Sequence, residues 1–273
     1  MLTYQERLER HLSSYRRDRL GVARCGTFRH KGVERVYGHI LPRELRWLNI
    51  PEAFRAEIRA YISANPRIQL HRYFHHLNSS QAFALNLFYP YLTLDKPTLS
   101  KALGISPIER GSFEEIPEPG EGTNVDVLLV VENDVPLYCE VKLSETGFGT
   151  APVDARHRKK VEKVYRPTLL GHVDSSLLDP EVFCASYQIL RNLWLAAKNP
   201  VGSVLFLLPK GNTALSAKLS HVLSRADPEL RARTRVVFME DVLKALAAAS
   251  SEGRGLSWYA AMLREKYVPS AAT

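Results

Sequence analysis

The order of apolar and polar positions predicts a run of helices followed by strands that alternate with helices. Near the N-terminus, apolar residues recur at the spacing of one helix face: Tyr4, Leu8, Leu12 and Tyr15. Pro51 opens a second amphipathic stretch. Further helices are predicted from 81 to 89, where Pro90 follows, and from 95 to 103. The first hundred residues are therefore expected to be mainly helical.

Two apolar runs in the middle of the chain predict an antiparallel hairpin. Residues 125–131 and 137–143 are separated by the turn-forming Asn133 and Asp134, and a shorter strand is expected near 113–116. The later predicted elements are a helix at 180–197, a strand at 203–208, a helix at 212–226, a strand at 234–238 and helices at 240–249 and 257–267. This order indicates an α/β fold with a mixed central sheet flanked by helices.

The composition is typical of a soluble globular protein. Of its 273 residues, 45% are hydrophobic and 24% are charged, which excludes global disorder. The longest apolar runs are far shorter than the roughly 20 residues that cross a bilayer, so no membrane segment is expected. The N-terminus carries Glu6 and Glu9 and lacks an apolar signal region, and the three cysteines form no CxxC pair. A cytoplasmic location is expected from these features.

The positive charge is concentrated in two places. Residues 1–76 hold 15 Lys or Arg against 7 Asp or Glu, whereas residues 77–273 hold 22 of each, so the first segment carries the whole net charge of +8. Aromatic residues among these arginines suit a surface that binds nucleic acid, and a solvated basic face is the alternative. A second cluster is expected to contact phosphates: Arg156, Arg158, Lys159, Lys160, Lys163 and Arg166.

Three charged residues in the predicted hairpin are the candidate catalytic group. Glu140 and Lys142 are two apart on one strand and so project from the same face, and Asp126 begins the strand expected opposite them. Charges in apolar strands are costly to bury unless they serve one another or a metal. Two carboxylates suit Mg²⁺, and a neighbouring lysine can position or deprotonate water for phosphodiester hydrolysis. Surface ion pairs at strand ends are the alternative.

The pattern of Asp126 followed by Glu140-Val-Lys142, within this order of elements, resembles the PD-(D/E)XK nuclease superfamily, which has the restriction-endonuclease-like fold. Three further stretches resemble a bacterial branch of restriction endonucleases: Leu77-Asn-Ser-Ser-Gln81 with Asn86, Lys142-Leu-Ser-Glu145-Thr-Gly-Phe-Gly149, and Tyr187-Gln188-Ile-Leu-Arg-Asn192. The resemblance covers about residues 75–210. Val125 stands where the family has proline, and nothing outside the core identifies an element that recognises a target sequence.

The resemblance implies roles for individual residues. Asp126 and Glu140 would be metal ligands together with the backbone carbonyl of Val141, and Lys142 would orient or activate water. Three residues would support the site: Gln188 on the later helix, Gln81 on an earlier helix, and Glu145, which could also serve a second metal. Three segments are expected: a basic, mainly helical extension (1–76), the nuclease core (77–210) and a helix–strand–helix extension (211–273).

These observations predict a Mg²⁺-dependent endonuclease, with Mn²⁺ as an alternative metal, that hydrolyses duplex DNA as a restriction-type enzyme. A catalytically silent nucleic-acid-binding module, an RNA nuclease and a repair nuclease are the alternatives. No GxxxxGK[ST] motif is present, so no nucleotide cofactor is expected. A homodimer is plausible, because a double-strand break usually needs two active sites.

Overall fold

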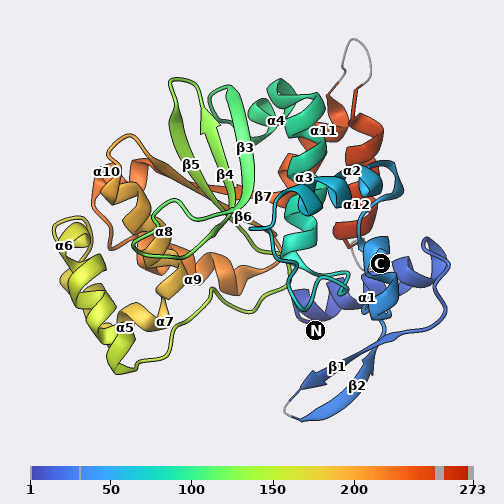
Figure 1. Ribbon diagram of the computed structural model, residues 1–273, viewed down its shortest axis with the longest axis horizontal. Coiled ribbons are helices and arrows are strands. Elements are labelled where there is room, and N and C mark those ends of the chain that lie inside the picture. Colours follow the sequence, from blue (N-terminus) through green and yellow to red (C-terminus); the bar gives the residue numbers. More distant parts are fainter. Residues whose placement is uncertain (1, 31, 250–254, 270–273) are drawn as a thin grey trace. The chain divides into compact units, whose positions relative to one another are not determined.

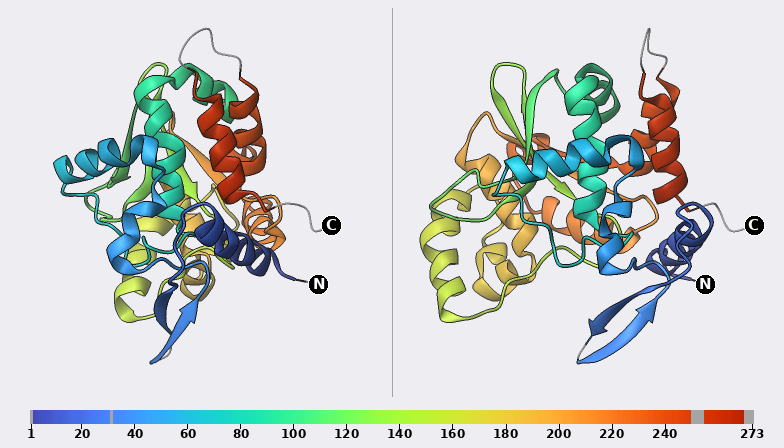
Figure 2. Two further views of the ribbon diagram at one scale, coloured as in Figure 1. Left: turned by 90° about the vertical axis from the view of Figure 1, so that its right-hand side faces the viewer. Right: turned by 45° about the vertical axis from the view of Figure 1, so that its right-hand side comes forward.

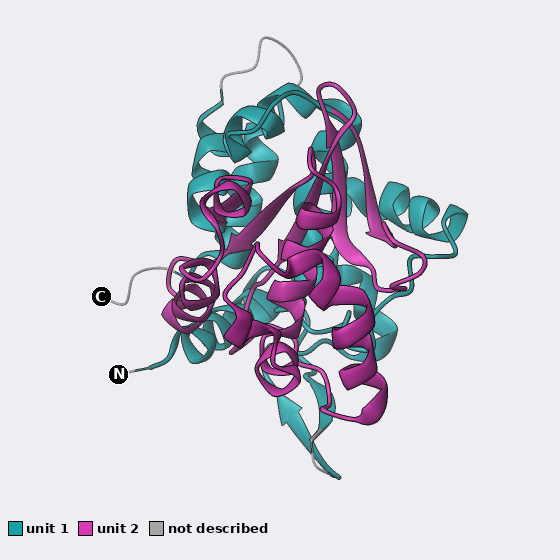
Figure 3. Cartoon of the chain, turned by 90° about the vertical axis from the view of Figure 1, so that its left-hand side faces the viewer, with its two compact units in different colours: residues 1–108, 239–273 teal, residues 109–238 magenta. Residues whose placement is uncertain are grey.

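The computed structural model describes residues 2–30, 32–249 and 255–269. The chain forms two compact units (Figure 3). Unit 1 comprises residues 1–108 and 239–273, and unit 2 comprises residues 109–238. Unit 1 thus combines the two ends of the chain, and unit 2 is the continuous segment between them. The division into an N-terminal extension, a nuclease core and a C-terminal extension stays a prediction.

Unit 2 is built on a five-stranded mixed sheet of order β3-β4-β5-β6-β7 (Figure 1). β4 and β5 are antiparallel, whereas β5, β6 and β7 run parallel. The strands are β3 (Ile108–Glu115), β4 (Val125–Val131), β5 (Val135–Val141), β6 (Ser203–Leu208) and β7 (Thr234–Phe238). The α/β class with a mixed sheet and flanking helices is thereby confirmed, and two predicted strands, 203–208 and 234–238, have the observed bounds.

The turn between β4 and β5 fixes the register of the central hairpin. Asn133 and Asp134 have positive φ angles of 65° and 55°, a conformation that Asn and Asp tolerate better than most residues. Val131 pairs with Val135 directly beyond this tight turn. The second strand therefore begins and ends two residues earlier than the predicted 137–143.

The helices of unit 2 cover an apolar core that includes Leu190, Leu193 and Phe206. α8 packs on β5 and β6. The predicted helix 180–197 is two helices, because the chain turns at Ser186. The helical segments are α5 (Ala155–Lys160), the π-helix η2 (Val161–Tyr165), α6 (Arg166–Leu169), η3 (Ser175–Leu178), α7 (Pro180–Ala185), α8 (Tyr187–Lys198), α9 (Thr213–Leu223) and α10 (Pro228–Ala232).

Unit 1 is mainly helical and joins the two ends of the chain, since α11 and α12 contact α4 and α1. Pro90 lies inside α3 instead of ending it, so the predicted stop at residue 89 is wrong. The helices are α1 (Tyr4–Asp18), η1 (Arg43–Asn49), α2 (Glu52–Ala64), α3 (Ser80–Leu94), α4 (Lys96–Leu103), α11 (Met239–Ala248) and α12 (Ser257–Tyr267). Within the described residues, no helix is both long and apolar enough to cross a membrane.

Unit 1 also contains a two-stranded antiparallel hairpin that the sequence pattern did not predict. β1 (Gly26–His30) pairs with β2 (Val33–Tyr37), and Figure 2 shows this ribbon extending away from the helices of its unit. Gly26 is required at its base, because a Cβ atom there would lie 2.3 Å from the carbonyl oxygen of Leu41.

Candidate active site

The β4–β5 hairpin brings the candidate carboxylates together. Val127 pairs with Cys139, so Asp126, the preceding residue of β4, lies level with Glu140, the residue that follows Cys139. Oδ2 of Asp126 accepts a hydrogen bond of 2.8 Å from the backbone N–H of Val141. The antiparallel register alone thus places both acids at one end of the hairpin.

Glu140 is fully buried and receives four donors. Oε1 lies 2.9 Å from Nζ of Lys142 and accepts a hydrogen bond of 2.5 Å from Nε2 of Gln188. Oε2 accepts a hydrogen bond of 2.9 Å from Nδ2 of Asn192 and lies 3.5 Å from Nη2 of Arg191. Burying a carboxylate costs free energy unless donors compensate it. These four side chains offset that desolvation cost and hold the Glu140 carboxylate in one orientation.

The two carboxylates have opposite electrostatic environments. Burial disfavours ionisation of Glu140, but the charges of Lys142 and Arg191 and its hydrogen bonds hold its pKa below the usual range. Burial and the charge of Glu140 together raise the pKa of Asp126 well above its usual range. Despite burial, Glu140 also raises the pKa of Lys142, which stays cationic in this arrangement. Negative charge on Asp126 is therefore incompletely compensated, and a cation placed there would relieve it.

Gln188 connects the site to the loop after β5. While Nε2 donates to Glu140, its Oε1 accepts a hydrogen bond of 2.8 Å from the backbone N–H of Gly149. A Cβ atom at Gly149 would lie 3.1 Å from that same oxygen, so the absence of a side chain permits the close approach. The carboxamide is consequently held in one orientation by groups on both sides.

The sequence reasoning assigned no role to Arg191 and Asn192, although both lie in the stretch that carried the family resemblance. With Gln188 they occupy positions i, i+3 and i+4 of α8, which share one face of a helix. Both are buried, and Nε of Arg191 and Oδ1 of Asn192 have no hydrogen-bond partner within the described structure. Polar residues at this spacing on an otherwise apolar helix were the signal that could have identified them.

Two other predicted supporting residues lie in different surroundings. Oε2 of Glu145 accepts a hydrogen bond of 2.7 Å from the backbone N–H of Leu143, and its charge acts on Lys142. Gln81 belongs to unit 1, where its Oε1 accepts a bond of 2.8 Å from the backbone N–H of His71 and its Nε2 donates to the carbonyl of Gln69. A role for Gln81 in the site stays a prediction.

The basic cluster divides into paired and unpaired residues. Arg158 lies 3.0 Å from Glu181, Lys160 lies 2.6 Å from Glu121 and Arg166 lies 2.7 Å from Glu162. The remaining three are exposed and have no ion pair among the residues the structure describes: Arg156, Lys159 and Lys163. These three are the best placed of the cluster for phosphate contact.

Lys160 and Glu121 form a second ion pair in unit 2, in which the carboxylate of Glu121 is buried and Lys160 is partly buried. The Glu121 carboxylate also accepts hydrogen bonds of 2.5 Å from the hydroxyls of Thr123 and Tyr165. Although burial opposes ionisation, these donors and Lys160 lower the pKa of Glu121 to about 2. The group ties the loop before β4 to the π-helix η2, which places Lys160 inside the fold of unit 2.

The donor set at the hairpin limits what the site can bind. No group of three or more His, Cys, Asp or Glu side chains within the described ranges is arranged to hold a metal ion. The oxygens at this end of the hairpin are those of the Asp126 and Glu140 carboxylates and the backbone carbonyl of Val141. Such hard donors, completed by water and phosphate oxygens, suit Mg²⁺, which commonly uses only one or two protein carboxylates.

Comparison with known proteins identifies a family to which the chain is similar over most of its length. The family model described as "Restriction Endonuclease associating with ARP" (REase-ARP) matches residues 9–268, a range that spans both units. No curated protein and no solved structure matches the chain.

Proposed function

Because the chain belongs to the REase-ARP family, restriction endonucleases associating with ARP, we propose that it is a Mg²⁺-dependent endonuclease that hydrolyses phosphodiester bonds in DNA. Membership confirms the resemblance to restriction-endonuclease-like proteins. The observation that carries the proposal is the meeting of Asp126, Glu140 and Lys142 on one hairpin, under a helix that adds Gln188.

Asp126, Glu140 and the Val141 carbonyl would hold Mg²⁺, with Mn²⁺ as an alternative. When bound, the ion supplies Lewis-acid assistance to the attack of water on the phosphodiester. Lys142 orients the attacking water through its ammonium group, which Glu140 holds at 2.9 Å. Gln188 fixes the orientation of Glu140 by a hydrogen bond from its carboxamide.

Substrate binding is proposed to rest on phosphate contacts. Arg156, Lys159 and Lys163 project from consecutive turns of α5 and η2 without acidic partners in the described structure, so they can track a phosphate backbone. Such contacts give affinity without sequence specificity. We also propose that the chain works with ARP, as the family description states of its members, and that it forms a homodimer to cut both strands.

A cleavage assay tests the proposal. Supercoiled plasmid, linear duplex, single-stranded DNA and RNA are incubated with the full chain in Mg²⁺, Mn²⁺ or EDTA, beside Asp126→Ala and Lys142→Ala. Glu132→Ala serves as a matched control, because Glu132 is an exposed acid in the same hairpin. Metal-dependent cutting of duplex DNA that both site variants lose and the control keeps is expected.

Undiminished cutting by Asp126→Ala would refute the proposal. Binding without cutting would instead indicate the silent nucleic-acid-binding module, and preferential cutting of RNA would indicate a ribonuclease.

A further inference from the structure

The segment around the β1–β2 ribbon carries half of the net charge of the protein. Residues 24–46 contain two acidic residues, Glu34 and Glu44, and six basic ones, a difference of 6 − 2 = +4 out of the total of +8. The basic residues are Arg24, Arg29, Lys31, Arg35, Arg43 and Arg46. This surplus of four positive charges has to be balanced by solvent ions or by an anionic partner.

The ribbon is attached at one face and exposed elsewhere. Phe28 packs edge-on against Tyr73 at 5.2 Å and against His76 at 5.5 Å, which fixes β1 to the rest of unit 1. Along β2, in contrast, Val33 is 53% and Val36 is 68% exposed. An isolated two-stranded ribbon is marginally stable in water, so the contacts of Phe28 stabilise β1 and β2, while both valines stay accessible to a partner.

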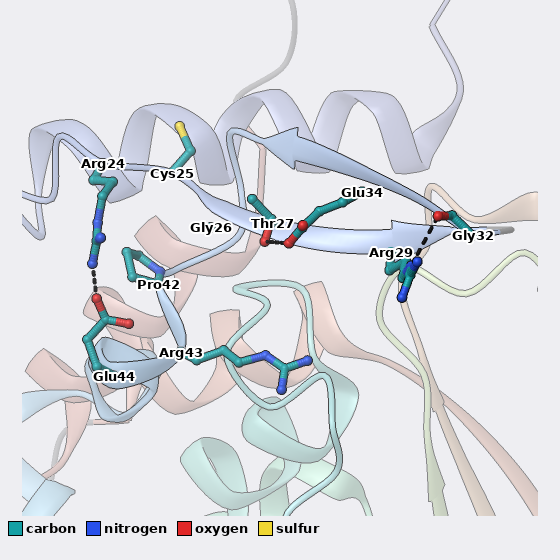
Figure 4. A pocket seen from close by; sticks show the side chains of 10 residues that line it. All are labelled: Arg24, Cys25, Gly26, Thr27, Arg29, Gly32, Glu34, Pro42, Arg43 and Glu44. Atoms are coloured by element: carbon teal, nitrogen blue, oxygen red, sulfur yellow. Dashed lines mark hydrogen bonds and ion pairs between the residues drawn. The ribbon is translucent and has the colours of Figure 1, made fainter.

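A pocket of about 770 Å³ lies beside the ribbon (Figure 4). Six of its lining residues are charged or hydroxyl-bearing: Arg24, Thr27, Arg29, Glu34, Arg43 and Glu44. Both glutamates are engaged, since Glu34 accepts a hydrogen bond of 2.5 Å from Thr27 and Glu44 pairs with Arg24. Within the described residues, Arg29 donates to the carbonyl of Gly32. Arg29 and Arg43 therefore face the pocket without an acidic partner among the described residues.

We propose that the β1–β2 ribbon lies in a groove of duplex DNA, with Arg29, Arg35 and Arg43 on the phosphate backbone. The inference rests on the proposed function and adds to it a separate substrate-binding element in unit 1. A two-stranded ribbon has the width that the major groove admits, and phosphates complement its unpaired guanidinium groups. Arg35 pairs with Phe28 across the ribbon, so it lies on the opposite face from Arg29 and the two can reach different strands.

Duplex DNA fits this surface better than a single strand. Single-strand binding relies on exposed aromatic rings for base stacking. The ribbon's own rings are used internally, because Phe28 contacts Tyr73 and Tyr37 contacts His39. Val36, which pairs with Thr27 on the face that carries Arg29, instead offers a small apolar surface that can contact thymine methyl groups in the major groove. The ribbon thereby supplies the target-contacting element that no sequence pattern outside the core had identified.

Binding measurements in EDTA, where no cleavage occurs, test the proposal. The full chain is titrated against a fluorescent 20-base-pair duplex and its single strand at several salt concentrations, and compared with the double variant Arg29→Gln/Arg35→Gln. Each phosphate contact adds roughly 0.9 to the exponent with which the binding constant falls as the salt concentration rises. One contact therefore strengthens binding about eightfold at 0.1 M salt relative to 1 M salt. Loss of two contacts should therefore lower the salt exponent by about 1.8 and weaken duplex binding by up to roughly 60-fold.

Arg10→Gln/Arg17→Gln is the matched control, because both residues are exposed arginines on α1 and the total charge changes equally. The control should keep the wild-type salt exponent. Equal weakening in both double variants, or an unchanged salt exponent in the ribbon variant, would overturn the proposal. Unchanged circular dichroism melting curves establish that each variant is folded.

Val36→Ser separates the apolar contact from the ionic one. It should weaken duplex binding while leaving the salt exponent unchanged, since it removes no phosphate contact. If Val36→Ser instead converts a dimer to a monomer in light scattering and DNA affinity stays the same, the ribbon is a self-association surface and the proposal fails. The proposed catalytic function is tested separately, because Asp126→Ala should lose cleavage and keep duplex binding, and its result does not depend on the ribbon variants.

Discussion

Replacing Asp126 with Asn is expected to stabilise the metal-free protein while abolishing cleavage. Burial and the nearby charge of Glu140 raise the pKa of Asp126, so ionising this carboxyl in the folded state costs free energy. An asparagine is neutral, and its carbonyl oxygen can still accept the hydrogen bond from Val141. The substitution thus removes the electrostatic cost and keeps the local geometry, a pattern found where a site is built for function rather than stability.

The magnitude follows from proton linkage. Because the folded-state pKa of Asp126 lies above its usual value of about 3.9, the folded protein binds more protons than the unfolded chain between these two values. In that window the free energy of unfolding of the wild type falls by about 1.4 kcal/mol for each unit rise in pH. Asp126→Asn has no ionisable group at this position. The difference in free energy of unfolding between the variant and the wild type therefore grows at the same rate as the pH rises, and it disappears below about pH 4.

Added Mg²⁺ should reverse the order of stability. An ion that binds only the folded state stabilises the wild type by about 1.4 kcal/mol for each tenfold increase above its dissociation constant. Asp126→Asn loses one of two carboxylates, so little stabilisation is expected in the variant. The reversal reports on metal binding without requiring any enzymatic activity.

Urea unfolding from pH 4 to pH 8 in EDTA, followed by a Mg²⁺ titration at pH 8, measures both effects. Asp134→Asn is the control, because Asp134 is an exposed aspartate in the turn of the same hairpin and asparagine tolerates its positive φ angle. Parallel pH dependence of Asp126→Asn and the wild type would refute the electrostatic reasoning. Equal stabilisation of both by Mg²⁺ would refute the assignment of the metal site.

Three further outcomes are expected. Glu121→Gln leaves Lys160 without its carboxylate partner, so the free energy of unfolding should fall by about 3 kcal/mol at pH 7. The wild type loses this advantage as the pH falls from about 4.5 through the folded-state pKa of Glu121 of about 2. Unfolding curves at pH 7 and pH 2 would show both effects. Gln188→Ala removes the donor to Glu140, so single-turnover cleavage should slow roughly 10- to 100-fold; an accompanying loss of DNA affinity in EDTA would contradict this positioning role. Burial lowers the pKa of Lys266, which lies against Asn49, well below its usual range, so the free energy of unfolding of the wild type should rise with pH by about 1.4 kcal/mol per unit up to about pH 10. Lys266→Met should abolish this rise. Identical pH slopes in the two proteins would contradict the prediction.

Much of the candidate catalytic group could be predicted from local sequence. The apolar runs and turn residues around Asn133 determine the hairpin, and the two-residue period of a strand places Glu140 and Lys142 on one face. Antiparallel pairing then puts Asp126 opposite them. These relations need only neighbouring residues, and the α/β class follows from the order of the elements.

The surroundings of that group required the tertiary structure. Arg191 and Asn192 approach Glu140 from about fifty residues away in sequence, and Lys160 forms an ion pair with Glu121, which lies 39 residues before it. A pattern of charges does not say which cations are paired, because pairing depends on contacts across long loops. The basic 156–166 stretch therefore looked uniform in sequence, whereas only Arg156, Lys159 and Lys163 lack acidic partners in the part of unit 2 described here.

The sequence by itself determined the hairpin that carries Asp126, Glu140 and Lys142, since period, turn chemistry and charge all act within about twenty residues. Tertiary structure decided the composition of each unit, because burying the apolar faces of α11 and α12 against the N-terminal helices joins opposite ends of the chain. It also decided the β1–β2 ribbon, whose exposed strands lack the buried alternation that marks a strand in sequence. The ribbon is held by contacts of Phe28 with Tyr73 and His76, which lie more than forty residues away in sequence. A local sequence pattern cannot predict such contacts.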